Sequence, residues 1–327
     1  MSSNDSSASP QETEGATVPP SSSEIVVGVD GSTRSRAALE WAARACADRG
    51  LGLVILHALS IPVVAVPFGE PLRPPPSPEV ADRCQRLLQE DADHVAQLYP
   101  DLPVRTEVSA LDPSYALLAA GRTAAMVVVG SRGLGAFASA FLGTVSIRVS
   151  AHASCPVAVV PDPATAEEGE TKERDGRGRI VVGLDGSHGA KAALRFALGE
   201  AARTGAEVVA VHAWLVPVLF DGAAFAASPY TADREFFATH ADKHVRTLVD
   251  EVRSEQAKDI PIHVEVVEDH AAHALLSAGE DADLIVVGSR GRGGFTGLLL
   301  GSVSQAVLHH APTPVVVVRS TPEDAED

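Results

Sequence analysis

The chain has 327 residues, 45% of them hydrophobic, and a formal net charge of −17. This acidic balance argues against a nucleic-acid partner, because binding a phosphate backbone needs a cationic surface. No apolar run reaches the roughly 18 residues of a membrane span, and the polar N-terminus lacks the features of a secretory signal. The three cysteines form no CxxC pair, so zinc and dithiol motifs are absent and reduced thiols in the cytoplasm are expected.

Residues 1–23 are rich in Ser, Pro, Glu and Thr and are predicted to be a disordered tail. An Ala-rich helix is expected over 35–49, ending at Gly50. Several short runs are apolar on both faces, which is typical of parallel strands covered by helices on both sides. Residues 24–162 are therefore predicted to form one α/β domain. Its strands are expected near 25–30, 52–58, 103–109, 125–130 and 156–160.

A polar stretch over 163–177 is predicted to be a linker, and after it the sequence repeats. Arg179–Ser187 matches Glu24–Ser32 with an offset of 155, and Ile285–Gly291 matches Val127–Gly133 with an offset of 158. A repeat of this length is a duplicated domain and not a solenoid unit. The predicted fold is therefore two repeated doubly wound α/β domains, each a five-stranded parallel sheet sandwiched by helices.

The second domain is expected over 178–320, followed by an acidic tail over 321–327. Its first long helix is expected over 190–204, ending at Gly205. Its strands are expected near 179–184, 207–213, 261–267, 283–288 and 314–318.

Asp30 and Asp185 follow the first strand of each half. Ligands of doubly wound sheets bind at the carboxyl ends of the strands. A carboxylate placed there can accept hydrogen bonds from ribose hydroxyl groups or help to hold a metal. Alternatively, Asp30 or the neighbouring Ser32 caps the next helix. These residues alone do not decide between the two interpretations.

A glycine-spaced loop follows the fourth strand of each half. The pattern is Gly-x-x-Gly, nine residues, then Gly-[Ser/Thr]-x-Ser, starting at Gly130 and again at Gly288. Glycines let the backbone approach a ligand closely, and free amides at a helix start form an anion site. The pattern is neither a Walker A loop nor a GxGxxG fingerprint. Because the same spacing occurs twice after a valine-rich strand, it predicts a polyphosphate site.

These motifs together resemble the universal stress protein family over about 24–161 and 179–319. The start motif, the glycine loop and a final Pro-Val strand occur in order in both halves. The resemblance implies an adenine nucleotide alpha hydrolase-like fold, and the two retained loops resemble the ATP-binding branch. It implies ATP as the ligand, with Mg²⁺ or Mn²⁺ held through the triphosphate and not by side chains.

The resemblance also implies individual site residues. Asp30 and Asp185 match an aspartate near adenine and ribose, and Ala58 and Ala213 match a position whose backbone contacts adenine. The phosphate and ribose loop of the first half comprises Gly130, Arg132, Gly133, Gly143, Thr144, Val145 and Ser146. In the second half it comprises Gly288, Arg290, Gly291, Gly301, Ser302, Val303 and Ser304.

The two copies differ outside the loop. Ala125 stands where the second half has Asp283, and a proline-rich segment over 69–78 replaces an alanine-rich one over 221–231. Both segments are expected to flank the ligand. The two sites can therefore differ in affinity.

Several histidines and arginines leave alternatives open. His240 with His244, and His270 with His273, lie at helical spacing, but no third ligand is visible, so solvated helix faces are favoured over metal sites. His57 and His212, at the end of the second strand, either line the pocket or cap the sheet. Arg132 and Arg290 either pair with phosphate or hold the loop through a surface carboxylate.

The copies share no Ser-His-Asp spacing, no paired catalytic carboxylates and no activated cysteine. The sequence therefore favours an ATP-binding regulator of the stress response over a dedicated enzyme. A slow ATP hydrolase or nucleotidyl-transfer enzyme, and an interaction scaffold with vestigial pockets, are the alternatives. The last strands, 156–160 and 314–318, are expected to pair within the chain as a pseudo-dimer. A further homodimer is not decided by the sequence.

Overall fold

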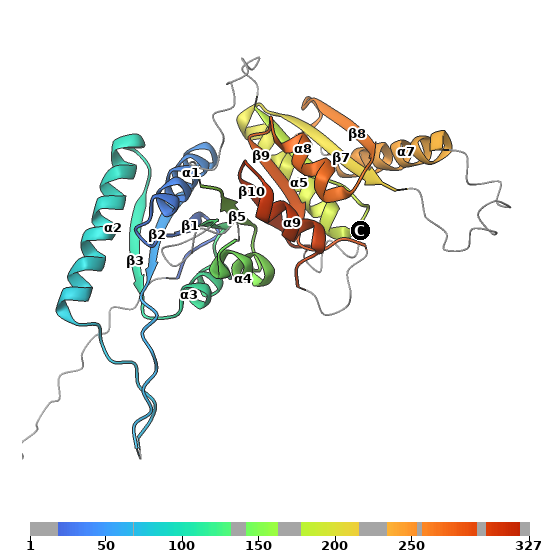
Figure 1. Ribbon diagram of the computed structural model, residues 1–327. Helices are drawn as coiled ribbons and strands as arrows, with labels where there is room; N and C mark the ends of the chain where they lie inside the picture. The colour runs from blue at the N-terminus through green and yellow to red at the C-terminus, as the bar shows by residue number, and fades with distance from the viewer. Residues whose placement is uncertain are drawn as a thin grey trace, which may run out of the picture.

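A computed structural model of the chain describes residues 19–67, 69–131, 142–162, 178–215, 234–253, 257–292 and 299–320. Strands and helices alternate in both halves (Figure 1). The first half comprises β1 (Glu24–Gly28), α1 (Thr33–Arg49), β2 (Gly52–Ala58), α2 (Pro78–Leu98), β3 (Val104–Ser109), α3 (Pro113–Ala120), β4 (Met126–Gly130), α4 (Thr144–His152) and β5 (Val157–Val160). The second half comprises β6 (Arg179–Gly183), α5 (His188–Thr204), β7 (Glu207–Trp214), α7 (Arg234–Val252), β8 (Ile262–Glu268), α8 (Ala271–Gly279), β9 (Leu284–Gly288), α9 (Ser302–His310) and β10 (Val315–Val318). The predicted α/β fold with two repeated domains is confirmed.

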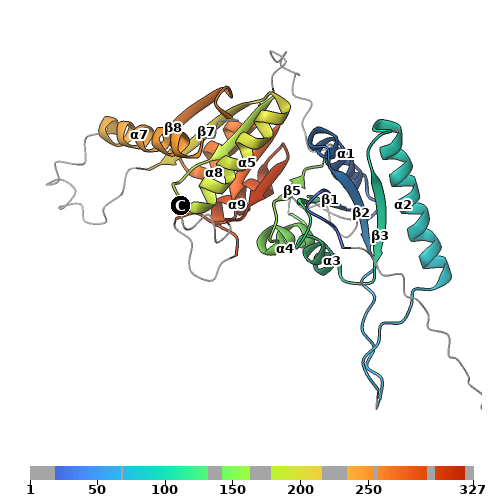
Figure 2. The ribbon, with the colours of Figure 1, turned by 180° about the vertical axis from the view of Figure 1, so that it is seen from behind.

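The strands form one ten-stranded sheet in the order β3-β2-β1-β4-β5-β10-β9-β6-β7-β8. All neighbours are parallel except β5 and β10, which meet antiparallel at the centre. Val316 lies opposite Ala158 in this pairing. These two residues are 158 positions apart, which is also the offset of the second repeat landmark. A pseudo-twofold axis therefore passes between them and relates the two halves. Figures 1 and 2 show β5 and β10 where the two halves meet.

The sheet is buried on both faces, as the valine-rich strands predict. On one face α1, α2, α5 and α7 cover a core that includes Leu39 and Leu194. On the other face α3, α4, α8 and α9 cover a core that includes Leu117 and Leu275. Consecutive residues of a strand point to opposite faces, so runs such as Val315–Val318 contribute to both cores.

The first helix of each half begins and ends at local signals. Ser32 and Ser187 are the N-caps, and each side chain accepts a hydrogen bond from an amide three residues on. Gly50 and Gly205 follow the helices with φ of 65° and 71°, in the left-handed region that glycine tolerates. The predicted glycine ends of these helices are confirmed.

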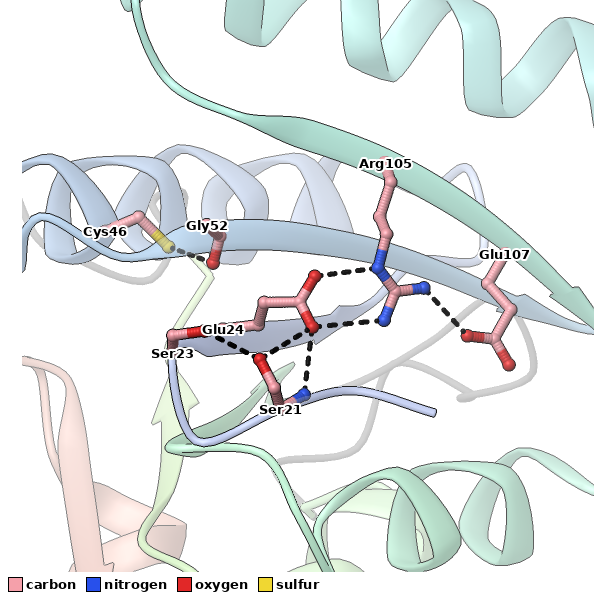
Figure 3. A network of polar contacts seen from close by, with 7 residues as sticks. All are labelled: Ser21, Ser23, Glu24, Cys46, Gly52, Arg105 and Glu107. Atoms are coloured by element: carbon pink, nitrogen blue, oxygen red, sulfur yellow. Dashed lines mark hydrogen bonds and ion pairs between the residues drawn. The ribbon is translucent and has the colours of Figure 1, made fainter. Parts of the chain in front are cut away.

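A polar network joins the amino ends of the strands in the first half (Figure 3). Arg105 on β3 donates to Glu24 on β1, with 2.7 Å between Nε and Oε1, and lies 3.5 Å from Glu107. The amide and the hydroxyl of Ser21 also contact Glu24. This edge is opposite to the carboxyl ends of the strands, where ligands of such sheets bind.

Residues 59–67 and 69–77 form an arm that leaves the end of β2 and extends away from the sheet (Figure 1). Val64 and Leu72 form an isolated antiparallel bridge in this arm. At its base Arg73 donates to the carbonyl of Ala110 at 2.9 Å. The segment over 69–78, expected to flank a ligand, belongs to this arm and the start of α2, and its counterpart over 221–231 lies outside the described residues.

Within the part of the chain that the structure describes, no helix combines the length and apolar character that crossing a membrane requires.

Candidate functional site

The second half contains an open cavity of about 560 Å³ at the carboxyl ends of its strands. Its walls come from the ends of β6, β7 and β9 and from the starts of α5, α8 and α9. The cavity therefore lies where doubly wound sheets bind ligands. Of the predicted site residues, those that line it are Asp185, Ala213, Gly288, Arg290, Gly291, Val303 and Ser304. The other lining residues are Gly183, Leu184, Ser187, Ala190, Val211, Ala271, Leu275 and Val287.

Asp185 connects the end of β6 to the loop after β9. Its Oδ1 accepts from the amide of Ser187 at 3.0 Å, and its Oδ2 accepts from the amide of Arg292 at 2.8 Å. A Cβ atom on Gly291 would lie 2.2 Å from Oδ2, so only glycine fits beside this carboxylate. The helix cap of α5 is Ser187 and not the aspartate. Asp185 therefore holds the loop in place from within the cavity.

The first half repeats one part of this arrangement. Asp30 Oδ1 accepts from the amide of Ser32 at 3.0 Å, and Ser32 is the N-cap of α1. Of the two capping candidates, Ser32 is therefore the one that caps the helix.

The glycine at the end of β9 lets two backbones touch. A Cβ atom on Gly288 would lie 2.8 Å from the carbonyl carbon of Gly189 in the first turn of α5. A Cβ atom on Gly189 would in turn lie 2.7 Å from the carbonyl oxygen of Arg290. Because these neighbours are backbone atoms, a larger residue would force α5 and the loop apart. Both glycines therefore set the width of the cavity.

The start of α9 has the features of an anion site. Its N-cap, Gly301, supplies no side-chain hydrogen bond, and its own amide donates to Ser289 O at 2.8 Å. Amides in the first turn of a helix lie at the positive end of its dipole and lack intrahelical acceptors. Ser302 stands at the first position of this turn. An anion in the cavity would therefore face an uncapped helix N-terminus.

The second serine of the motif also has a structural role. Ser304 donates its hydroxyl hydrogen to Gly288 O at 2.7 Å, and Ser146 donates in the same way to Gly130 O at 2.7 Å. Both residues are buried. In each half this hydrogen bond ties the start of the helix to the end of the preceding strand.

Arg290 brings positive charge to the cavity. It is exposed and lines the cavity. Burial and the nearby Arg290 charge lower the pKa of Arg319, which follows β10 and is not among the residues that line the cavity. A bound anion would be attracted to the Arg290 guanidinium, which favours phosphate over a neutral group.

The histidines at the ends of β2 and β7 bind backbone. His57 Nδ1 lies 2.8 Å from Val29 O, and His212 Nδ1 lies 2.7 Å from Leu184 O. A carbonyl only accepts, so Nδ1 carries the proton in both rings. Each histidine ties the end of one strand to the residue after its neighbour, and His212 is not among the residues that line the cavity. Of the two interpretations left open, capping of the sheet fits the geometry.

One histidine of each predicted pair contacts another side chain. His240 stacks on Phe236 with ring centroids 6.2 Å apart, and His273 pairs with Asp269. Among the described residues, no group of three His, Cys, Asp or Glu side chains is placed to hold a metal ion.

In the first half, the predicted site residues lie on the corresponding strands and helices. Gly143 is the N-cap of α4, again without a side-chain hydrogen bond, and Thr144 is the first helical residue. Ala58 ends β2. Arg132 and Gly133, predicted for the loop, lie outside the described residues, whereas Val145 lies in the first turn of α4.

One replacement in the first half changes the packing of α1. Arg34 stands at the position of Gly189 and pairs with Asp162, with 2.5 Å between Nε and Oδ2. The first half therefore has an ion-paired arginine at the position where α5 has a glycine packed against backbone.

Sequence reasoning missed residues that shape the cavity without being polar. Leu275 lies under Gly183, where a Cβ atom would come within 3.0 Å of its Cδ1. Gly28 has the same relation to Leu117, at 3.1 Å. The repetition of this glycine in both start motifs was a signal that could have been used. The leucines gave none, because they look like ordinary core residues.

The chain matches the model of the universal stress protein family twice, over residues 22–161 and 176–319. The chain belongs to this family. A universal stress protein of Mycobacterium tuberculosis H37Rv is 36% identical over 314 residues, covering 91% of this chain and 97% of that protein. One from Mycolicibacterium smegmatis is 35% identical over 313 residues, covering 90% and 96%. A universal stress protein structure from Archaeoglobus fulgidus has a TM-score of 0.60 and 22% identity, covers 93% of this chain and 98% of that chain, and shows the shared fold.

Proposed function

We propose that this universal stress protein binds an adenine nucleotide, ATP with Mg²⁺ or Mn²⁺, in each half and regulates other proteins through its occupancy. The observation that carries the proposal is the convergence in one cavity of Asp185, the glycine-lined backbone at Gly288 and Gly291, and the uncapped start of α9. Apolar walls with a few convergent polar groups are typical of small-molecule sites. The positive charge of Arg290 favours a ligand that carries phosphate.

Each part of the nucleotide has a matching wall. The backbone at Ala213 and the apolar side chain of Leu275 suit a flat base, and the Asp185 carboxylate suits ribose hydroxyl groups. The first turn of α9 and Arg290 suit the phosphates. A divalent ion would be held mainly by phosphate oxygens, because Asp185 is the one carboxylate among the described residues that line the cavity.

The contact between Asp185 and the loop suggests how occupancy is communicated. Asp185 Oδ2 accepts from the amide of Arg292 at 2.8 Å. A ribose hydroxyl that binds the same oxygen competes with this amide. Nucleotide binding is therefore expected to release the loop at Gly291 and Arg292 and to change the surface beside the site. This coupling makes the site suitable for a regulator.

Isothermal titration of the whole chain with Mg-ATP tests the proposal. Up to two sites per chain are expected, and Gly288→Ala should remove the site of the second half, because the new Cβ meets the backbone of Gly189. Gly199→Ala is the matched control, since a Cβ there meets only the flexible Arg203 side chain, at 3.4 Å. Absence of heat at millimolar ATP, or unchanged binding in Gly288→Ala, would overturn the proposal.

The same titration with ADP, AMP and cyclic AMP identifies the preferred adenine nucleotide. Mass spectrometry of the purified protein shows whether a nucleotide co-purifies, which would count against a vestigial pocket. A turnover assay completes the set. If the protein hydrolyses one ATP in much less than a minute, and Asp185→Asn abolishes this activity, the site belongs to an enzyme and not to a regulator.

A further inference from the structure

The halves join at the β5–β10 strand pair, and the pseudo-twofold axis between these strands relates two regions of this joint. Each region, called a corner below, lies between the residue that follows the last strand of one half and the last turn of the last helix of the other half. Residues related by the axis differ by 158 in number. Arg319, which follows β10, therefore corresponds to Pro161, which follows β5. Ala151 in the last turn of α4 corresponds to His309 in the last turn of α9. Both corners have the same backbone but different side chains.

At one corner the space is filled by Arg319. Its Nη2 donates to the carbonyl oxygen of Ala151. The last carbonyls of a helix lack intrahelical donors and lie at its negative end, so a cation is favourable there. The Nε atom of Arg319 and the Oγ atom of Ser150 are buried without a hydrogen-bond partner. The guanidinium group of Arg319 therefore fills this corner.

At the other corner the corresponding space is open. The proline side chain of Pro161 cannot reach across it as Arg319 does, and a groove of about 380 Å³ remains, part of it open to solvent. Both halves contribute to its walls. The lining residues are Ser131, Leu142, Val159, Pro161, Leu308, His309, Ala311, Thr313 and Val315.

The chemistry of this groove suits a cation with several N–H donors. The carbonyl of His309 stands where Ala151 O accepts from Arg319, at the negative end of α9. Ser131 and Thr313 add hydroxyl oxygens that can accept. The other lining residues have apolar side chains, against which the flat, weakly hydrated faces of a guanidinium can pack better than an ammonium ion.

The imidazole of His309 does not oppose a cation. Its Nδ1 accepts from the amide of Leu142 at 3.3 Å, so this nitrogen is unprotonated. Burial, and then the neighbouring His310, lower the pKa of His309. The ring is therefore neutral at neutral pH and links α9 to the segment that leads into α4.

We propose that this groove between the halves binds a guanidinium group, in the place that Arg319 occupies on the other side of the axis. The group could belong to a small guanidino compound or to an arginine side chain of a partner protein. None of the residues that line the groove is among those of the cavity in the second half, whereas Ser131 and Leu142 belong to the glycine loop of the first half. The proposal is therefore independent of nucleotide binding in the second half, and it is tested on nucleotide-free protein.

Nuclear magnetic resonance of the whole chain labelled at histidine tests the proposal. The His309 signal, assigned with His309→Gln, is followed during titration with methylguanidinium and, separately, methylammonium. A saturable shift with methylguanidinium, at least tenfold weaker with methylammonium, is expected. No saturable shift, or equal responses to the two ions, would overturn the proposal.

Variants at the two corners give a second readout. Pro161→Arg should fill the groove from within and abolish the shift, whereas Pro161→Gln, of similar length but uncharged, should retain it. Arg319→Ala should open the second corner and raise the number of methylguanidinium sites per chain from one to two. Undiminished binding in Pro161→Arg, or an unchanged number of sites in Arg319→Ala, would contradict the proposal, and thermal melting checks that each variant folds.

The source of the guanidinium is distinguished with short peptides. Gly-Arg-Gly amide binding at least tenfold more tightly than methylguanidinium, with Gly-Lys-Gly amide inactive, would support an arginine of a partner chain. Equal affinity of Gly-Arg-Gly amide and methylguanidinium would support a free guanidino compound.

Discussion

The two halves of the chain share a backbone but not the chemistry at its edges. Near the carboxyl ends of the strands, the second half has Gly189 and Arg319 where the first has Arg34 and Pro161. At the amino ends of the strands the ion pairs differ: Glu24 pairs with Arg105 in the first half, whereas Arg179, at the position of Glu24, pairs with Glu265 in the second.

This difference shows which residues the duplicated fold needs. The strands remain valine-rich in both copies because both faces of the sheet are buried. Side chains at strand ends face solvent or a ligand, so they can change without loss of the core. Two sites built on one backbone are therefore expected to bind with unequal affinity, and the contacts at the joint between the halves are asymmetric.

The largest effect is expected at the strand pair that joins the halves. Val316 is fully buried opposite Ala158. Val316→Asp places a carboxylate without a partner in the core and should lower the free energy of unfolding by about 4 kcal/mol or more. Urea denaturation measures it, with Val80→Asp on the exposed face of α2 as the control. Two separate unfolding transitions, of which Val316→Asp lowers only one, would show that the strand pair does not stabilise both halves.

A smaller effect is expected at a contact that has no symmetric counterpart. Arg49 at the end of α1 lies 2.8 Å from Glu200 of α5, and both side chains are largely buried. Arg49→Ala leaves the Glu200 carboxylate with Arg203 as its remaining ion-pair partner and should cost about 2 kcal/mol. The double substitution to methionine should cost less, because it removes both charges. Additive losses in a double-mutant cycle would show that the two side chains do not interact.

A smaller effect again is expected when the residue at one equivalent position is exchanged between the two halves. Gly189→Arg introduces a Cβ atom 2.7 Å from Arg290 O. It should weaken nucleotide binding to the second half tenfold or more, about 1.4 kcal/mol. The reverse change, Arg34→Gly, should leave that site unaffected. Isothermal titration calorimetry measures the affinity of each variant for nucleotide. Equal losses of affinity in Gly189→Arg and Arg34→Gly would show that this position does not distinguish the two halves.

The smallest effect is expected at the charge pair of the first half. The hydrogen bond from Arg105 is the main reason that the pKa of Glu24 is lowered. Both side chains are partly exposed, so Glu24→Gln should cost only about 0.5 kcal/mol at pH 7.

The pH dependence of that cost follows from the lowered pKa. A carboxyl group whose pKa is lowered by folding stabilises the protein above its unfolded pKa, and this contribution is lost as the pH falls through the folded value. The difference between wild type and Glu24→Gln should therefore vanish in acid. Chemical denaturation at several pH values measures it, with exposed Glu70→Gln as the control, and a constant difference would contradict the assignment.

The sequence alone predicted most of the framework. Alternation of apolar runs and helical patterns located the strands to within about two residues, and Gly50 and Gly205 marked the helix ends. These features can be predicted locally, because a strand that is buried on both faces is rich in apolar residues and a left-handed position favours glycine. The last strands, expected to pair, lie side by side in the structure.

The contacts that shape the sites could not be predicted from the local sequence. The bond from Arg292 to Asp185 joins residues 107 positions apart, and Gly189 is notable only because Gly288 packs on it. Likewise the ring of His212 could face a ligand or a carbonyl, and only the position of Leu184 O decides. Each contact depends on which atoms approach in space, which no spacing along the chain expresses.

By itself the sequence determined a duplicated α/β domain with a glycine loop after the fourth strand, because periodic burial and glycine conformation are encoded residue by residue. The tertiary structure decided that Asp185 holds that loop and that Arg319 fills one corner of the joint while Pro161 leaves the other open. These outcomes arise where two elements meet, since a side chain there acts through whatever the other element presents to it.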